Sequence, residues 1–237
     1  MRTERLTEAI VDYVLIPGAG GVAWYWHLVE AELAARGHAA VAVELPTDDD
    51  TAGLADYAAT VLAAAGDRRG VVVVGQSMGA FTAPLVAQPL QAKAIVLLNA
   101  MIPVPGETPG AWWDNVGSSE ARVAAANERG YTPEFDMFTY FLHDLSAELA
   151  AEGEPYQKGQ ADRPFGDACA FDAWPAPVSV IAGRDDRFFP VSLQQRLARE
   201  RVGVEATVVP GGHLAALSHP VEVTDAILAS TLVQTGG

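Results

Sequence analysis

Short runs of apolar residues alternate along the chain with longer, amphipathic stretches rich in alanine. Each apolar run predicts a buried β-strand, and the runs cover residues 11–16, 39–45, 71–74, 93–98, 178–182 and 205–209. The intervening stretches predict helices near residues 25–36, 53–65, 78–88, 191–201 and 220–233. This alternation predicts an α/β fold with a mostly parallel, doubly wound sheet, in which functional side chains gather at the carboxyl ends of the strands.

The alternation stops between Met101 and about Ala170, where proline, glycine and aromatic residues are frequent. The pattern predicts one domain over residues 1–237, with a core of 1–100 and 171–237 and an inserted, mainly helical cap at 101–170. Two adjacent tryptophans of this segment, Trp112 and Trp113, are candidate substrate-binding residues. Because neighbours in sequence cannot share one face of a helix, we expect one to pack inward and the other to line a pocket.

Composition and charge narrow the class of protein. A chain of 237 residues, half of them apolar and 19% charged, is typical of a globular α/β domain. The formal net charge of −15 and the lack of a Lys/Arg-rich run predict that nucleic acid and anionic lipid surfaces are repelled. Cys169 is the only cysteine, which excludes an internal disulfide and a multi-cysteine metal site.

The apolar stretch from Ala9 to Ile16 is short and contains Asp12. It predicts a strand, because a signal sequence or a membrane span needs a longer uncharged run. We therefore expect a cytoplasmic protein without a membrane partner, and nothing in the sequence indicates its oligomeric state.

Residues 75–79 form a G-x-S-x-G motif, which follows a run of valines and precedes a predicted helix. A strand, this motif and a helix are typical of a nucleophile elbow, in which flanking glycines permit a tight turn and the serine, here Ser77, projects from the sheet. The alternative is an ordinary turn in which Ser77 caps the helix. Pro84 lies inside the predicted helix, where proline is unfavourable.

A serine nucleophile needs a general base and a group that orients the base. His213 follows a strand and a glycine turn, so we expect it at the carboxyl edge of the sheet, within reach of Ser77. Asp185 and Asp186 follow another strand, and either can orient the histidine or pair with a neighbouring arginine. Solvated or capping roles are expected for the other histidines, His27, His38, His143 and His219.

Three parts of the chain resemble the α/β-hydrolase superfamily, and in particular small cofactor-free esterases of the plant methylesterase and hydroxynitrile lyase type and their bacterial relatives. They are residues 15–38, residues 71–80, and the pair 181–190 with 210–220. In that family pattern an acid lies three residues after a strand-end glycine and four before a proline. Gly183 and Pro190 therefore select Asp186 over Asp185, and the G-x-x-H turn of the family aligns with His213.

The resemblance also implies an oxyanion hole made of the backbone amides of Ala19 and Met78. This chain has Pro17-Gly18 where the family commonly has His-Gly, so a side chain that buttresses the loop is missing. The implied activity is hydrolysis of a small to medium hydrophobic carboxylic ester through an acyl-enzyme on Ser77. Such chemistry needs a small-molecule substrate but no metal and no organic cofactor.

Other functions compete with this interpretation. A G-x-G-x-x-A pattern at Gly18, Gly20 and Ala23, with Glu44 after the next strand, resembles a dinucleotide-binding motif. Aromatic residues at positions 24–26 crowd that helix start, and a dinucleotide site leaves the serine and histidine motifs unexplained. A slow-turnover ligand sensor, a lyase, a thioesterase and a cofactor-free oxygenase all use the same scaffold, and the sequence does not separate them from a hydrolase.

Overall fold

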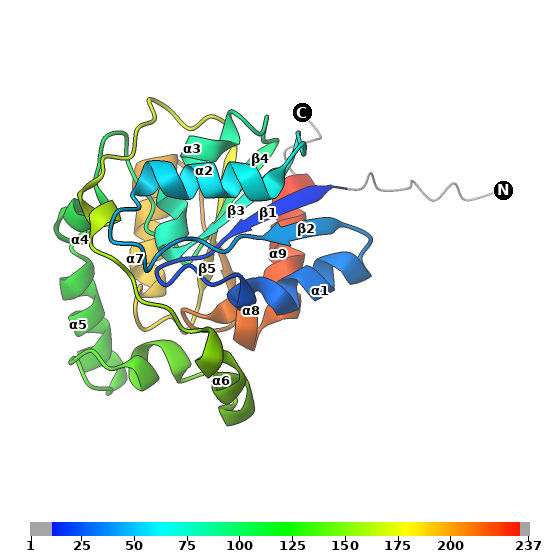
Figure 1. The fold of residues 1–237 in the computed structure, drawn as a ribbon. Helices are drawn as coiled ribbons and strands as arrows, with labels where there is room; N and C mark the ends of the chain where they lie inside the picture. Colours follow the sequence, from blue (N-terminus) through cyan, green and yellow to red (C-terminus); the bar gives the residue numbers. More distant parts are fainter. Residues whose placement is uncertain (1–10, 233–237) are drawn as a thin grey trace.

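A computed structural model describes residues 11–232 and contains a six-stranded sheet with helices on both faces (Figure 1). The strands are β1 (Asp12–Ile16), β2 (Ala39–Ala42), β3 (Val72–Gln76), β4 (Ala94–Leu98), β5 (Val178–Gly183) and β6 (Thr207–Val209). They are all parallel and follow the order β2-β1-β3-β4-β5-β6. The strand order reverses between β1 and β3, and ligands of open α/β sheets bind at such a point.

Helices of the core pack on the two faces of this sheet (Figure 1). One hydrophobic cluster joins the sheet to α2 (Leu54–Ala65), α3 (Ala83–Ala87) and α7 (Val191–Leu197). A second cluster, on the opposite face, joins it to α1 (His27–Ala35), α8 (Ala215–Ser218) and α9 (Pro220–Leu232). The predicted α/β fold with a doubly wound parallel sheet is therefore confirmed.

Two of the six predicted buried strands lie at the edges of the sheet. β2 is only partly buried, and β6 exposes 41% of Val208. The prediction of a buried strand is wrong for these two, because each has a neighbouring strand on one side only. The four central strands are buried almost throughout.

Three predicted helices are not regular along their whole length. The predicted helix 78–88 is divided into the 3₁₀ helix η2 (Ser77–Phe81) and α3, and Pro84 lies in the first turn of α3, where its missing N–H costs no hydrogen bond. The predicted helix 25–36 begins with the 3₁₀ helix η1 (Ala23–Trp26), and 191–201 ends in the π-helix η6 (Ala198–Val202). Residue 233 of the last predicted helix and the predicted N-terminal residues Ala9 and Ile10 lie outside the described residues.

The segment between β4 and β5, drawn largely in green in Figure 1, lies beside the sheet. It contains α4 (Pro109–Val116), α5 (Ser118–Arg129), the π-helix η3 (Phe138–Leu142), α6 (Ala147–Gly153), and the 3₁₀ helices η4 (Glu154–Tyr156) and η5 (Arg163–Gly166). We call residues 101–170 the inserted segment. That this segment forms a cap distinct from the core stays a prediction. Across residues 11–232, no helix is long and apolar enough to cross a membrane.

Candidate active site

Ser77 lies directly after β3, at the point where the sheet order reverses. Its φ angle is +50°, a strained left-handed conformation that only a tightly packed turn sustains. Gly79 provides the room for this turn, because a Cβ atom there would lie 2.5 Å from the carbonyl oxygen of Pro17. The backbone around Ser77 thus has the sharp strand-to-helix geometry of a nucleophile elbow.

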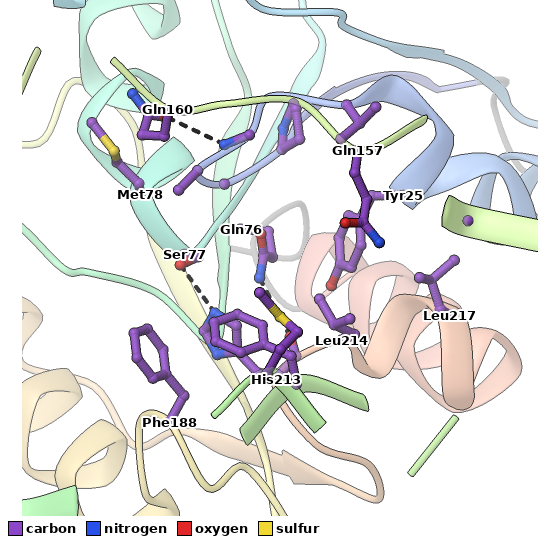
Figure 2. A pocket seen from close by; sticks show the side chains of 18 of the residues that line it. Tyr25, Gln76, Ser77, Met78, Gln157, Gln160, Phe188, His213, Leu214 and Leu217 are labelled. Atoms are coloured by element: carbon purple, nitrogen blue, oxygen red, sulfur yellow. Dashed lines mark hydrogen bonds between the residues drawn. The ribbon is translucent and has the colours of Figure 1, made fainter. Parts of the chain in front are cut away.

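His213 and Asp186 form a chain of hydrogen bonds with Ser77, part of which is visible in Figure 2. His213 Nε2 lies 3.1 Å from Ser77 Oγ, and His213 Nδ1 lies 2.9 Å from Asp186 Oδ2. The other carboxylate oxygen of Asp186 accepts hydrogen bonds from the amides of Phe188 and Phe189, at 2.8 and 2.9 Å. The structure brings the three predicted catalytic residues together, whereas Asp185 is exposed and contacts the backbone of Gly211 instead.

Two polar side chains that the sequence did not single out hold the histidine loop from the sheet side. Asn99, after β4, donates through Nδ2 to the carbonyls of Gly212, at 2.8 Å, and His213, at 3.2 Å. Gln76 donates through Nε2 to the carbonyl of His213 at 3.3 Å. Their positions at the ends of β3 and β4 are a signal that could have pointed to them, since strand ends are where such folds place functional groups.

The predicted oxyanion-hole residues Ala19 and Met78 both line the cavity that contains Ser77. The loop after β1 lies directly on the serine turn, because a Cβ atom on Gly18 would be 2.8 Å from the Cβ of Ser77. Gln160 of the inserted segment accepts a hydrogen bond from the amide of Gly20 at 3.2 Å (Figure 2). This contact supports the loop that lacks the family's histidine.

The glycine pattern of the competing dinucleotide motif has a different structural explanation. Gly18 is required by the close approach of its loop to Ser77. Glu44, the expected ribose-binding acid, accepts a hydrogen bond from the amide of Ala23 at 2.7 Å and pairs with Lys158 of the inserted segment. Glu44 thus joins the loop after β1 to the inserted segment.

A cavity of about 400 Å³ surrounds Ser77 and has mainly apolar walls. Trp113 lines this cavity, as do Phe188 and the aliphatic side chains of Leu214 and Leu217. Trp112 is completely buried outside it, and its indole N–H donates to the carbonyl of Ile102 at 3.1 Å. Of the two candidate substrate-binding tryptophans, only Trp113 is therefore placed to contact a substrate.

Two further groups bear on the chemistry of the site. Burial raises the pKa of the Cys169 thiol to about 12, and its sulfur contacts the carbonyl oxygen of Phe81 at 3.2 Å, so the thiol stays protonated at neutral pH. Within residues 11–232, no group of three or more His, Cys, Asp or Glu side chains is arranged to hold a metal ion. Ser77, which lines the cavity and lies 3.1 Å from Nε2 of His213, is a well-placed nucleophile.

Comparisons of the sequence identify related proteins. Residues 13–226 match the model of the alpha/beta hydrolase family. Methylesterase 7 of Arabidopsis thaliana is 34% identical over 104 residues, which are 38% of this chain and 40% of the relative. The probable esterase PIR7A of Oryza sativa subsp. indica is 32% identical over 110 residues, 41% of this chain and 42% of the relative. The matched region thus spans less than half of the length of these relatives.

Solved structures share the fold over most of the chain. Polyneuridine aldehyde esterase superposes with a TM-score of 0.70 at 19% identity, covering 93% of this chain and 99% of that protein. The methylesterase MES16 from Arabidopsis superposes with a TM-score of 0.72 at 17% identity, covering 94% and 100%. The fold agrees with the family match, and this chain belongs to the alpha/beta hydrolase family, with plant methylesterases and esterases among its relatives.

Proposed function

We propose that this protein hydrolyses carboxylic esters with Ser77 as nucleophile, His213 as general base and Asp186 as the group that orients the histidine. One observation carries the proposal: the three side chains form a continuous hydrogen-bonded chain at the wall of an apolar cavity. The contacts of 3.1 and 2.9 Å are within the range that proton transfer requires. The relatives named as esterases support the same reaction class.

In the first half of the reaction, Ser77 Oγ attacks the carbonyl carbon of the ester while its proton passes to His213 Nε2. Asp186 accepts the hydrogen bond from Nδ1, which selects the reactive tautomer and stabilises the imidazolium. The amides of Ala19 and Met78 donate to the oxygen that becomes negatively charged. The tetrahedral intermediate collapses, the alcohol leaves with the proton from His213, and an acyl group remains on Ser77.

In the second half, His213 removes a proton from a water molecule, which attacks the acyl carbon. Collapse of this second intermediate breaks the bond to Ser77 Oγ, and His213 returns the proton to the serine. The products are a carboxylic acid and an alcohol. Every proton in this cycle is exchanged between His213, Ser77, water and the substrate. No atom changes its oxidation state, so water is the only co-reactant.

The apolar walls of the cavity favour a hydrophobic substrate. Trp113 and Phe188 pack on the cluster of one sheet face, whereas Leu214 and Leu217 belong to the cluster of the other face. In Figure 2, Ser77 and Phe188 lie toward one side of the view and Leu217 toward the other. An ester that occupies both sides therefore carries apolar groups on its acyl and its alcohol part, and the net charge of −15 disfavours strongly anionic esters.

Labelling with a fluorophosphonate tests the proposal. We expect the wild-type protein to be labelled once, and Ser77→Ala to abolish labelling and to lower ester turnover by about 10⁴-fold or more, because the triad acts as a unit. Ser230→Ala, which removes a hydroxyl from α9 that bonds the carbonyl of Ala226, is the matched control and is expected to behave like the wild type. Equal labelling of wild type and Ser77→Ala would refute the assignment of the nucleophile.

Pre-steady-state burst kinetics separate a hydrolase from a sensor on the same scaffold. With a chromogenic ester in excess, we expect release of alcohol to continue linearly after any burst, because His213 can activate water for deacylation. A burst of one equivalent without further turnover would instead identify a protein that captures its ligand.

A further inference from the structure

The loop that carries His213 has little rigidity of its own. Gly211 and Gly212 directly precede the histidine, and Gly211 adopts a φ angle of +104°. Glycine restricts the backbone less than any other residue. The orientation of the imidazole therefore depends on the groups that hold the peptide units next to it.

The sheet and the inserted segment hold this loop from different sides. Asn99, at the end of β4, binds the carbonyl oxygens of Gly212 and His213. Asp144, which follows η3 in the inserted segment, accepts a hydrogen bond from the Gly212 amide at 2.5 Å through Oδ2. The same oxygen accepts the hydroxyl of Ser218 at 2.7 Å, which keeps the carboxylate turned toward the loop. The N–H and C=O of Gly212 are thus held by two side chains that are distant in sequence.

The backbone of Gly212 lies close to two side chains of the inserted segment. A Cβ atom on Gly212 would lie 2.8 Å from Nε2 of His143 and 2.9 Å from Oδ1 of Asp144. Both side chains are partly buried, and hydrogen bonds to an ionised carboxylate are stronger than those between neutral groups. Asp144 thus provides a hydrogen bond between the inserted segment and the histidine loop, in addition to the ring contact of Phe141 with His213.

We propose that Asp144 is a positioning residue, which holds the Gly212 amide and thereby fixes the His213 imidazole between Ser77 and Asp186. The inserted segment then has two roles, because it lines the substrate cavity and also completes the geometry of the general base. A base displaced by about 1 Å can lower the rate of reaction about a hundredfold while substrate binding is retained. This role rests on the proposed function of His213.

Three variants of the full chain test the proposal. Their kinetics are measured with an ester that the wild-type protein turns over. Asp144→Ala removes the acceptor and is expected to lower kcat at least about tenfold, with KM within roughly twofold of the wild-type value. Asp144→Asn keeps an oxygen acceptor and is expected to recover much of kcat. Asp136→Ala is the matched control, because that exposed carboxylate accepts an amide hydrogen bond within the inserted segment at 2.8 Å and does not contact the histidine loop.

Proton NMR of the His213 Nδ1–H gives a readout that needs no substrate. A buried imidazole proton hydrogen-bonded to the carboxylate of Asp186 is shifted downfield. We expect its resonance to be lost or broadened by exchange in Asp144→Ala but to be retained in Asp144→Asn and Asp136→Ala. Wild-type kcat and an unchanged resonance in Asp144→Ala would overturn the proposal. The proposal would also be overturned if kcat fell in both Asp144→Ala and Asp144→Asn in proportion to the fall in melting temperature. Failure of the wild type to react with phosphonate or ester would refute the proposed function instead, while the NMR comparison still tests the positioning.

Discussion

At the scale of single residues, Asp185 and Asp186 follow β5 side by side but have different environments. Asp186 is 1% exposed and accepts hydrogen bonds from His213 and from two backbone amides. Asp185 is exposed, and its contact with the amide of Gly211 is 3.4 Å long. Of the two carboxylates, only that of Asp186 contacts the imidazole, as the proposed role requires.

We therefore predict that Asp186→Asn is much more damaging than Asp185→Asn. An amide at position 186 can donate a hydrogen bond to Nδ1 and stabilise the wrong tautomer, which lowers kcat by about 10⁴-fold in such triads. Asp185→Asn is expected to change kcat/KM little, because the replaced group is at the surface. Steady-state kinetics on one ester measure both effects. Similar losses in the two variants, or the reverse order, would contradict the assignment of Asp186.

At the scale of elements, α4 directs the side chains of its two adjacent tryptophans into different environments. Trp112 is fully buried against Phe189, with ring centroids 5.1 Å apart, and its N–H is hydrogen-bonded. Trp113 is partly exposed, lines the cavity and contacts Phe188 edge to face at 5.5 Å. Successive positions of a helix point in different directions, so one residue stabilises the helix while the other faces the cavity.

We predict that alanine substitutions of these tryptophans have separable effects. Trp112→Ala is expected to lower the free energy of unfolding by about 3–5 kcal/mol, because it empties a closely packed site. Trp113→Ala is expected to change KM and the preference among esters while phosphonate labelling of Ser77 persists. Urea unfolding and kinetics on an ester panel provide the two measurements. If neither stability nor ester preference changes in either variant, α4 contributes neither core nor cavity wall.

At the scale of the whole molecule, a buried ion pair links the start of the inserted segment to the core. Arg201 of η6 donates through Nη2 to Oε1 of Glu107 at 3.0 Å, and also binds the carbonyl of Ile102 at 2.7 Å. The side chain of Glu107 is 2% exposed and that of Arg201 is 11% exposed. Asn115 of α4 donates to the same carboxylate at 2.8 Å. Loss of one partner would leave a buried charge unpaired, which is more costly than loss of the pair.

We predict that Glu107→Ala destabilises the protein by about 3–5 kcal/mol, and that Glu107→Leu combined with Arg201→Met is less destabilising than either single change. Neither residue lines the cavity, so the folded fraction is expected to retain its kcat. Urea unfolding of Glu107→Ala and of the four proteins of the cycle, which are the wild type, the two single variants Glu107→Leu and Arg201→Met and the double variant, measures stability. Kinetics below the transition measure kcat. Additive losses of stability would show that the pair does not act as a unit.

The sequence by itself determined the alternation of strands and helices, the elbow at Ser77 and the positions of His213 and Asp186 after strand ends. These features depend on residues that are close together along the chain: a period of hydrophobic residues, a G-x-S-x-G turn, and aspartates and glycines at fixed distances from a strand. The expected cytoplasmic location depends on the short apolar stretch that contains Asp12, and the expected lack of a nucleic-acid partner depends on net charge. Both stay predictions.

Only the tertiary structure decided which strands lie at the edges, which tryptophan of α4 faces the cavity, and which side chains support the proposed triad. Asn99 binds a loop 113 residues away, Asp144 one that is 68 residues away, and Gln160 reaches across 140 residues to Gly20. A strand-end position draws attention to Asn99, but no local pattern predicts which peptide group a side chain contacts. A carboxylate or an amide side chain in a loop has the same sequence surroundings whether it faces solvent or another backbone. Its role depends on which distant peptide group the packing of the inserted segment brings within hydrogen-bonding distance.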